Sequence, residues 1–348
     1  MKIFSKFSAA AILSLLLLVP NYAQNNNDVV RLAVPGLGSS ARALGMGNSY
    51  ISLSDDASAA FFNPAGFGLL KRLEFSGGFN YVNYGNKADF FNTSTDYSNS
   101  STQFSRISFA FPFPTMRGSL VFGIAYHKNK DLTGALKFSA INPTSSYISY
   151  NTQFNDNNLY DLYLSYPTST GDATTINGEL SQYGDILSSG DINNWTFSGA
   201  VEIYKNLFVG LNLNIITGNY ENTYNYNEED VNNLYQGQTD PGETDPNKIV
   251  SDFQLLHIDK HLNWDISGWD AKIGLLYQAN PMLRIGTTIQ FPKIFSVKEN
   301  YSDNFSADFA TGPISLTPYS DEVEYDIVTP YEFGFGLAAN VKGLIFSA

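Results

Sequence analysis

The feature that most constrains this chain is an alternation of apolar and polar residues that recurs from Leu73 onward. Successive side chains of an extended strand point to opposite faces, so each alternating stretch predicts a β-strand with one apolar face. The stretch from Leu207 to Ile215 is the clearest example. Similar strands are predicted at residues 73–81, 106–113, 120–127, 160–166, 195–203, 271–277, 283–291 and 331–337. About eleven or twelve such segments predict an all-β, antiparallel fold.

The residues at the ends of these segments favour a membrane barrel over a soluble sandwich. A β-sandwich alternates in the same way, so alternation alone leaves it as the alternative. Aromatic residues such as Trp195, Tyr204 and Tyr277 lie where strands begin or end, as in the girdles of outer-membrane barrels. Charged residues make up only 15% of the chain, while aromatic residues also reach 15%. Soluble domains carry about 25% charged residues. The sequence therefore predicts a transmembrane β-barrel.

The connections between strands are of two lengths, as the barrel hypothesis requires. Lys205-Asn206 and Asn280-Pro281 predict tight turns. Long polar loops are predicted from Asn86 to Phe104, from Lys128 to Asn158, and from Asn219 to Lys248. Tight turns on one side and long loops on the other are typical of outer-membrane barrels.

A change of parity near Gly268 predicts an irregular strand. Apolar residues run through Leu262, Trp264 and Ile266, and then through Trp269 and Ile273 in the opposite phase. We expect a bulge or turn at this point, because an extra residue exchanges the two faces.

The first residues predict export. Lys2 and Lys6 precede an apolar run from Phe7 to Val19, which is too short for a membrane-spanning helix. We interpret residues 1–23 as a signal peptide with cleavage after Ala23. With no cysteine in the chain, a lipid anchor is not expected.

Residues 24–72 differ in composition from the predicted strands, because they are rich in Gly, Ala and Ser, and they predict a small helical unit. Ser54, followed by Asp55 and Asp56, predicts a helix start, and Ala57 to Phe62 predict one short helix. The helix should stop at Asn63, because the residue before a proline is driven out of helical geometry. A second short helix is predicted at Ser39 to Leu44, ended by Gly45-Met46-Gly47.

This stretch resembles the FadL/TodX family of outer-membrane transporters for hydrophobic compounds. The matching residues read SSARALGMGNSYISLSDDASAAFFNPAGFGLL from Ser39 to Leu70, and Asn63-Pro64-Ala65 matches the Asn-Pro-Ala motif of the family's plug. Weaker similarity continues at LRIG, Leu283 to Gly286, and at TPYEFGFGLA, Thr329 to Ala338.

The resemblance implies a FadL-like fold and function. It implies a fourteen-stranded barrel with an N-terminal hatch in the lumen, and passive uptake of long-chain fatty acids or aromatic hydrocarbons through a side opening. We therefore expect a signal peptide at 1–23, a hatch at 24–72 and a barrel at 73–348. Fewer strands are predicted than the family has, and the chain ends inside the alternating segment Leu344-Ile345-Phe346. We expect a truncated, incomplete barrel.

The expected function is passive transport of hydrophobic small molecules across a Gram-negative-type outer membrane, without enzymatic chemistry or cofactors. Apolar cargo would enter from the loops, rest beside the hatch and leave sideways. Asn63, Pro64 and Ala65 are the residues expected to gate the path, although they equally fit a plain helix stop. The barrel is expected to be a monomer that contacts outer-membrane lipid and lipopolysaccharide and is inserted by the barrel-assembly machinery.

A second family shares the sequence patterns Arg-Ala-x-Gly-Met-Gly and Asn-Pro-Ala. These are the PorV-like outer-membrane barrels of type IX protein secretion, and they give the alternative function. A secretion shuttle should present a larger exposed loop surface, whereas a transporter should have an apolar pocket beside its hatch.

Three other patterns in the sequence are better explained by structure than by chemistry. Gly36 to Ala41 fits the dinucleotide fingerprint G-x-G-x-x-A, but no βαβ pattern surrounds it. His257 and His261 lie in an extended segment, where i and i+4 are about 13 Å apart and cannot share a metal. The acidic loop from Asn219 to Lys248 lacks EF-hand spacing, so no metal site is expected. The net charge of −13 argues against nucleic acid.

Overall fold

The computed structural model describes residues 26–38, 40–246 and 248–348. The predicted signal peptide, residues 1–23, lies outside the described residues. The chain forms two units, residues 1–35 and 36–348. The first unit contains helix α2 (Asn26–Ala33), in which Arg31 pairs with Asp28 at 2.7 Å. Among the described residues, no helix is long and apolar enough to cross a membrane.

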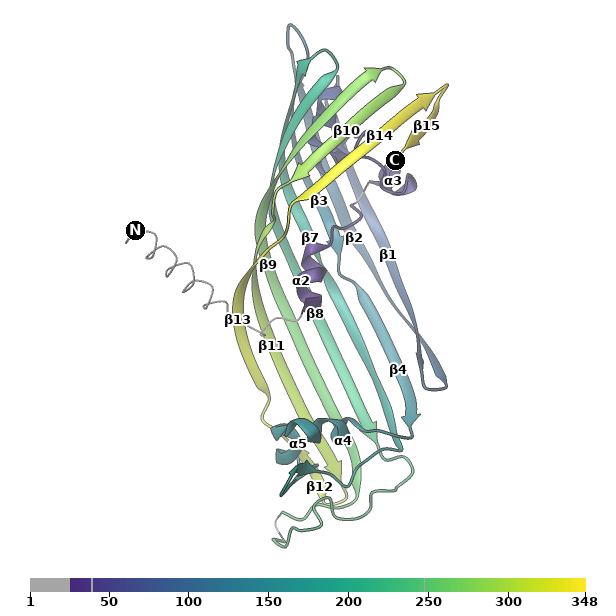
Figure 1. Cartoon of the computed structure of the whole chain (residues 1–348), viewed down its shortest axis with the longest axis vertical. Coiled ribbons are helices and arrows are strands. Elements are labelled where there is room, and N and C mark those ends of the chain that lie inside the picture. The colour runs from purple at the N-terminus through teal and green to yellow at the C-terminus, as the bar shows by residue number, and fades with distance from the viewer. Residues whose placement is uncertain (1–25, 39, 247) are drawn as a thin grey trace, which may run out of the picture. The chain divides into compact units, whose positions relative to one another are not determined.

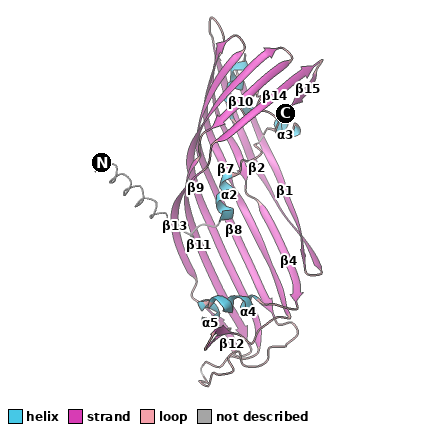
Figure 2. Cartoon of the chain, in the orientation of Figure 1, coloured by secondary structure: helices cyan, strands magenta, loops and turns pink. Residues whose placement is uncertain are grey.

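Strands dominate the second unit (Figure 2). Its helices are α3 (Ala41–Gly45), η1 (Ala57–Ala60), η2 (Pro64–Leu69), α4 (Tyr147–Asn151), η3 (Thr152–Phe154) and α5 (Asn157–Asp161). Its strands are β1 (Glu74–Phe90), β2 (Thr93–Phe113), β3 (Leu120–Asp131), β4 (Gly134–Asn142), β5 (Tyr166–Thr168), β6 (Gly171–Ala173), β7 (Leu180–Tyr204), β8 (Leu207–Glu229), β9 (Phe253–Asn280), β10 (Leu283–Gln290), β11 (Ile294–Phe309), β12 (Gly312–Ser315), β13 (Tyr319–Val328), β14 (Glu332–Val341) and β15 (Leu344–Ser347).

The strands build one antiparallel, curled sheet of thirteen strands, with β5 and β6 apart as a hairpin. Its main path is β1-β2-β3-β7-β8-β9-β10-β14-β15 (Figure 1). Within the described residues no strand pairs with the outer edge of β1, so the sheet is open. The prediction of an all-β antiparallel fold with a small helical part is confirmed.

Three pairs of consecutive strands each form one long strand with an interruption at a similar level of the sheet. These pairs are β3 with β4, β10 with β11, and β13 with β14. β3 and β4 pair in succession with β7, and β10 and β11 pair in succession with β9. β14 and β13 follow the same pattern against β10 and β11. Pro292 and Pro330 lie in two of these interruptions. Proline has no N–H to donate to the ladder, which favours an interruption at these two positions.

A row of aromatic and aliphatic side chains marks one boundary of an apolar outer band. Along the pairing register this row runs Ile107, Tyr126, Trp195, Ile215 and Trp269. On the turn side of this row the outward side chains are apolar, as predicted. On β8 the band extends from Leu207 to Ile215. Eight rises of about 3.4 Å give about 27 Å along the strand, comparable with the about 25 Å band of outer-membrane barrels.

On β9 the two faces exchange character at this row without a bulge. On β9, Ile258, Trp264 and Ile266 are buried on the inner face, whereas Trp269 is exposed on the outer face. The pairing of β9 with β8 continues through Gly268 without a register shift. The predicted bulge at Gly268 is therefore wrong. The apolar residues change face because the strand passes from a section with an apolar exterior to one with an apolar interior.

The long strands also correct several predicted loops. Most of Asn86 to Phe104 belongs to the hairpin of β1 and β2, and Asn219 to Glu229 continues β8. Polar outward residues therefore lie on strands that extend past the apolar band. The tight turns at Lys205-Asn206 and Asn280-Pro281 are confirmed, since β7 leads directly into β8 and β9 into β10.

The segment between β4 and β7, residues 143–179, folds over the loop ends of the strands, and we call it the cap (Figure 1). The strand predicted at residues 160–166 is wrong, because this stretch belongs mainly to α5 and the turn after it. Its leucines face the interior of the cap rather than one side of a sheet. We call the large sheet the wall. Five aliphatic side chains of the cap are fully buried against wall residues that include Phe253, Leu256, Ile258, Phe305 and Phe309; these five are Ile148, Leu159, Leu162, Leu164 and Ile176. At about 1.5 to 3 kcal/mol for each side chain, this burial favours the packed cap by about 8 to 15 kcal/mol before the entropy of ordering is subtracted.

Candidate functional site

The candidate site forms where part of the predicted hatch meets the inner face of the sheet. From here on, the hatch means residues 40–70. Ser40 caps α3, and Asp56 caps η1 by accepting a hydrogen bond from the Ser58 N–H at 2.9 Å. The prediction that Ser54 starts this helix is wrong. Ser54 instead donates its hydroxyl to the Tyr50 carbonyl at 2.7 Å, because it still belongs to the preceding turn. Asn63 is extended as predicted, but η1 already ends at Ala60, before the predicted end at Phe62, and Pro64 begins a further short helix, η2.

Asn63, Pro64 and Ala65 are buried where the hatch docks onto the wall. The Asn63 amide donates to the Ile51 carbonyl at 2.9 Å and to the Leu275 carbonyl of β9 at 3.2 Å, and its Oδ1 accepts from the Ala65 N–H at 3.0 Å. Every hydrogen-bonding atom of this buried amide is therefore satisfied. The motif joins the hatch to the sheet.

Two glycines of the wall make this docking possible. Gly210 of β8 and Gly274 of β9 are register partners. A Cβ on Gly210 would lie 2.3 Å from the Pro64 carbonyl carbon, and one on Gly274 would lie 2.0 Å from Asn63 Oδ1. No side chain fits at either position, so the hatch backbone rests directly on the wall.

Charged residues hold the hatch at a second point. Asp55 pairs with Arg42 of α3 at 2.6 Å and with Arg284 of β10 at 2.8 Å. Burial raises the pKa of the Asp55 carboxyl, but hydrogen bonds and charges from Arg284 and Arg42 outweigh it and lower the pKa below its usual value. Asp55 therefore stays ionised and ties the hatch to the wall near neutral pH.

A third set of contacts holds Ala60 and Phe61. Asn212 of β8 donates to the Ala60 carbonyl at 2.6 Å, and Lys272 of β9 donates to the Phe61 carbonyl at 2.6 Å. The Lys272 ammonium also lies 5.6 Å from the centre of the Phe61 ring. These contacts fix the position of Phe61 within the sheet's concave side.

Opposite Phe61, two neighbouring strands separate. β2 and β3 pair from Phe113 with Leu120 as far as Arg106 with His127, where the ladder ends although both strands continue. Close to this point lie four buried side-chain atoms without a hydrogen-bond partner among the described residues. They are Gln103 Oε1, Ser105 Oγ, Arg106 Nε and His127 Nδ1. A buried polar atom is usually hydrogen-bonded, so this group of four has room for a partner such as water or a bound molecule.

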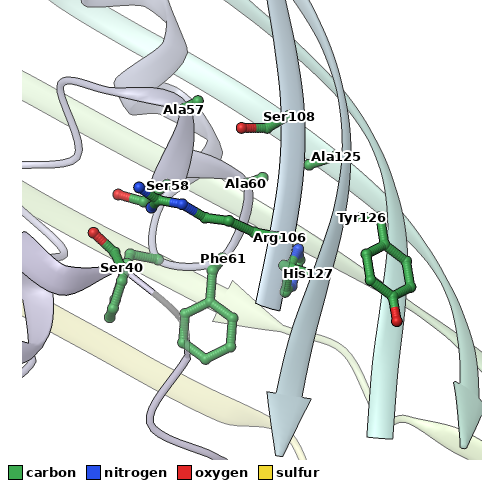
Figure 3. A pocket seen from close by; sticks show the side chains of 11 residues that line it. Ser40, Ala57, Ser58, Ala60, Phe61, Arg106, Ser108, Ala125, Tyr126 and His127 are labelled. Atoms are coloured by element: carbon green, nitrogen blue, oxygen red, sulfur yellow. The ribbon is translucent and has the colours of Figure 1, made fainter. Parts of the chain in front are cut away.

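A small pocket of about 20 Å³ opens at this separation (Figure 3). Its lining residues all come from the hatch, β2 and β3, and are Ser40, Ala57, Ser58, Ala60, Phe61, Phe62, Arg106, Ser108, Ala125, Tyr126 and His127. The Phe61 and His127 rings meet edge to face, with centroids 5.4 Å apart. The lining of the pocket is mostly apolar, while Arg106 adds a guanidinium and the serines add hydroxyl groups. Among the described residues, no carboxylate lines this pocket.

The predicted gating residues and the pocket are distinct parts of the hatch. Asn63, Pro64 and Ala65 lie in the docking contact, and none of them lines the pocket. Arg106, His127 and Phe61 are functional candidates that were not predicted from the sequence. A usable signal was present for two of them, because Arg106 and His127 are basic residues on the inward face of predicted strands, where small residues otherwise prevail.

Solved structures similar to this chain include two transport proteins. No protein-family model matches the sequence, and no curated protein matches it. The CymD monoaromatic hydrocarbon channel has 15% identity and a TM-score of 0.46, over 90% of this chain and 68% of that chain. The Ralstonia pickettii toluene transporter TbuX has 14% identity and a TM-score of 0.35, over 90% of this chain and 87% of that chain.

Proposed function

We propose that this protein is a passive transporter of hydrophobic compounds in a Gram-negative-type outer membrane. The observation that carries the proposal is the pocket beside the hatch at the point where β2 and β3 separate. A hydrophobic compound in this pocket lies next to a break in the wall that begins at the Tyr126 boundary of the apolar band, so it can pass between the inner face and the edge of the bilayer without crossing paired strands. Transfer from water is favoured by about 25 cal/mol per Å² of apolar surface.

The outer surface supports the membrane location. The apolar band on the turn side of the row of Tyr126, Trp195 and Trp269 faces outward. Such exposure is costly in water and favourable in lipid. We therefore place the apolar band among membrane and lipopolysaccharide acyl chains. Insertion by the barrel-assembly machinery and a monomeric state belong to the same proposal.

The pocket suits long-chain fatty acids and aromatic hydrocarbons to different degrees. Apolar and aromatic side chains accept either class. Among the described residues, Arg106 has no carboxylate partner, so its guanidinium is free to pair with the carboxylate of a fatty acid. We place fatty acids first among the cargo classes for this reason.

Uptake measurements test the proposal. The full chain is inserted in outer membranes, and entry of a labelled long-chain fatty acid and of toluene is compared with an empty-vector control. We expect uptake of the fatty acid, with weaker uptake of toluene. A correctly inserted protein that takes up neither would favour the alternative, a PorV-like role in type IX secretion.

Variants of Arg106 test the basis of cargo choice. We expect Arg106→Gln to reduce fatty-acid uptake about tenfold and to leave toluene uptake unchanged, because only the acid uses the charge. Arg106→Lys should restore part of the fatty-acid uptake. Equal losses for both cargos would show that Arg106 supports the fold and does not select cargo.

The role of Asn63, Pro64 and Ala65 as gating residues is part of the proposal. If movement of the hatch controls passage, Asn63→Ala should change the rate of uptake while the protein remains inserted and folded. An unchanged rate would leave the motif with its docking role alone.

A further inference from the structure

A buried carboxylate connects the cap to the wall. Glu228, on β8, is fully buried, and it accepts hydrogen bonds from the cap at Ser146 Oγ, 2.6 Å, and the Tyr147 N–H, 2.5 Å. It also accepts from the wall at Gln182 Nε2, 2.6 Å, and the Tyr226 hydroxyl, 2.8 Å. Lifting the cap would break two of these four hydrogen bonds, which is unfavourable.

The other end of the cap is held as well. The Tyr235 hydroxyl accepts from the N–H groups of Asn177 and Gly178, both at 3.0 Å, and donates to the Gly178 carbonyl at 2.7 Å. Between the two attachments, the aliphatic side chains of the cap are fully buried against the wall. Opening the cap would therefore break both attachments and expose a hydrophobic core in one step.

We infer that the cap is a fixed closure of the loop end, and that cargo reaches the pocket through the separation of β2 and β3. This inference rests on the proposed transport function and replaces the entry step through the loops. The location of the pocket agrees with it, because every lining residue belongs to the hatch, β2 or β3, and none belongs to residues 143–179.

Cross-linking the cap tests this inference, and the cysteine-free sequence is a suitable background. Tyr147 in the cap and Tyr226 in the wall have ring centroids 5.6 Å apart. The variant Tyr147→Cys with Tyr226→Cys would be bridged by a short bis-methanethiosulfonate reagent. The matched control is Asp185→Cys with Asn225→Cys, a register pair of β7 and β8 that is already fixed.

Fatty-acid uptake after bridging should stay within about twofold of the unbridged variant, because a fixed cap has no motion to lose. The control pair should behave in the same way. Loss of most uptake on bridging only the cap pair, with recovery after reduction, would overturn the inference and make the cap a moving lid.

Amide hydrogen exchange tests the cap without relying on transport. We expect the amides of α4 and α5 to be as protected as those of β8, and Glu228→Ala to accelerate their exchange. Unprotected cap amides in the parent protein would overturn the inference. Absence of uptake by the parent protein would refute the proposed function, while the exchange result would still decide whether the cap is fixed.

Discussion

At the residue scale, Gly274 and Gly210 determine how closely the hatch meets the wall. We expect Gly274→Ala to destabilise the docked hatch by about 1 to 3 kcal/mol, because its Cβ would overlap Asn63 Oδ1. Hatch release is measured by limited proteolysis of the folded protein. Gly199→Ala is the control, since a Cβ there meets only Phe122 at 3.7 Å. Adding Asn63→Ala should make the Gly274→Ala cost smaller, and strictly additive effects would contradict the proposed overlap.

At the element scale, the hatch is held partly by charge and should respond to pH. The lowered pKa of Asp55 means that the folded state stabilises its ionised form. This contribution is fully present above the unfolded value of about 3.9 and is lost as the pH falls through the lower folded pKa. We expect protease sensitivity of the hatch to rise below about pH 4 in the parent protein. Asp55→Asn should be sensitive already at pH 7. The exposed Asp89→Asn serves as control, and identical pH profiles for all three proteins would argue against the Asp55 contacts.

At the scale of the whole sheet, the outward faces have two characters, separated by the row of Tyr126, Trp195 and Trp269. Leu211 lies on the outer face within the apolar band, and Asn219 lies on the same face of β8 beyond that row. We expect Leu211→Arg to reduce the stability of the bilayer-inserted protein by about 2 to 4 kcal/mol, and Asn219→Arg to change it by less than about 1 kcal/mol. Unfolding by denaturant in lipid vesicles measures both. Equal costs at the two positions would contradict the placement of the membrane boundary.

Much of the sheet was predictable, because alternation is a local property of a strand. The segment from Leu207 to Ile215 needs no distant residue to show its two faces. Residues 160–166 also alternate, but they form part of the cap. Burial against the wall stabilises apolar side chains in a helix or turn as well as in a strand, so the alternation did not identify a strand here. At Gly268 the local pattern was again misleading, since a change of environment along one regular strand imitates a bulge.

The candidate site was less predictable, because it combines residues from distant parts of the chain. The sequence by itself determined the strand faces, the tight turns and the extended backbone at Asn63, since each depends on neighbouring residues and backbone sterics. Only the tertiary structure decided that Phe61 meets His127 beside Arg106, that two wall glycines receive Asn63 and Pro64, and that Glu228 holds the cap. Strand register and the docking of the hatch place these residues together, and both depend on contacts between residues far apart in sequence.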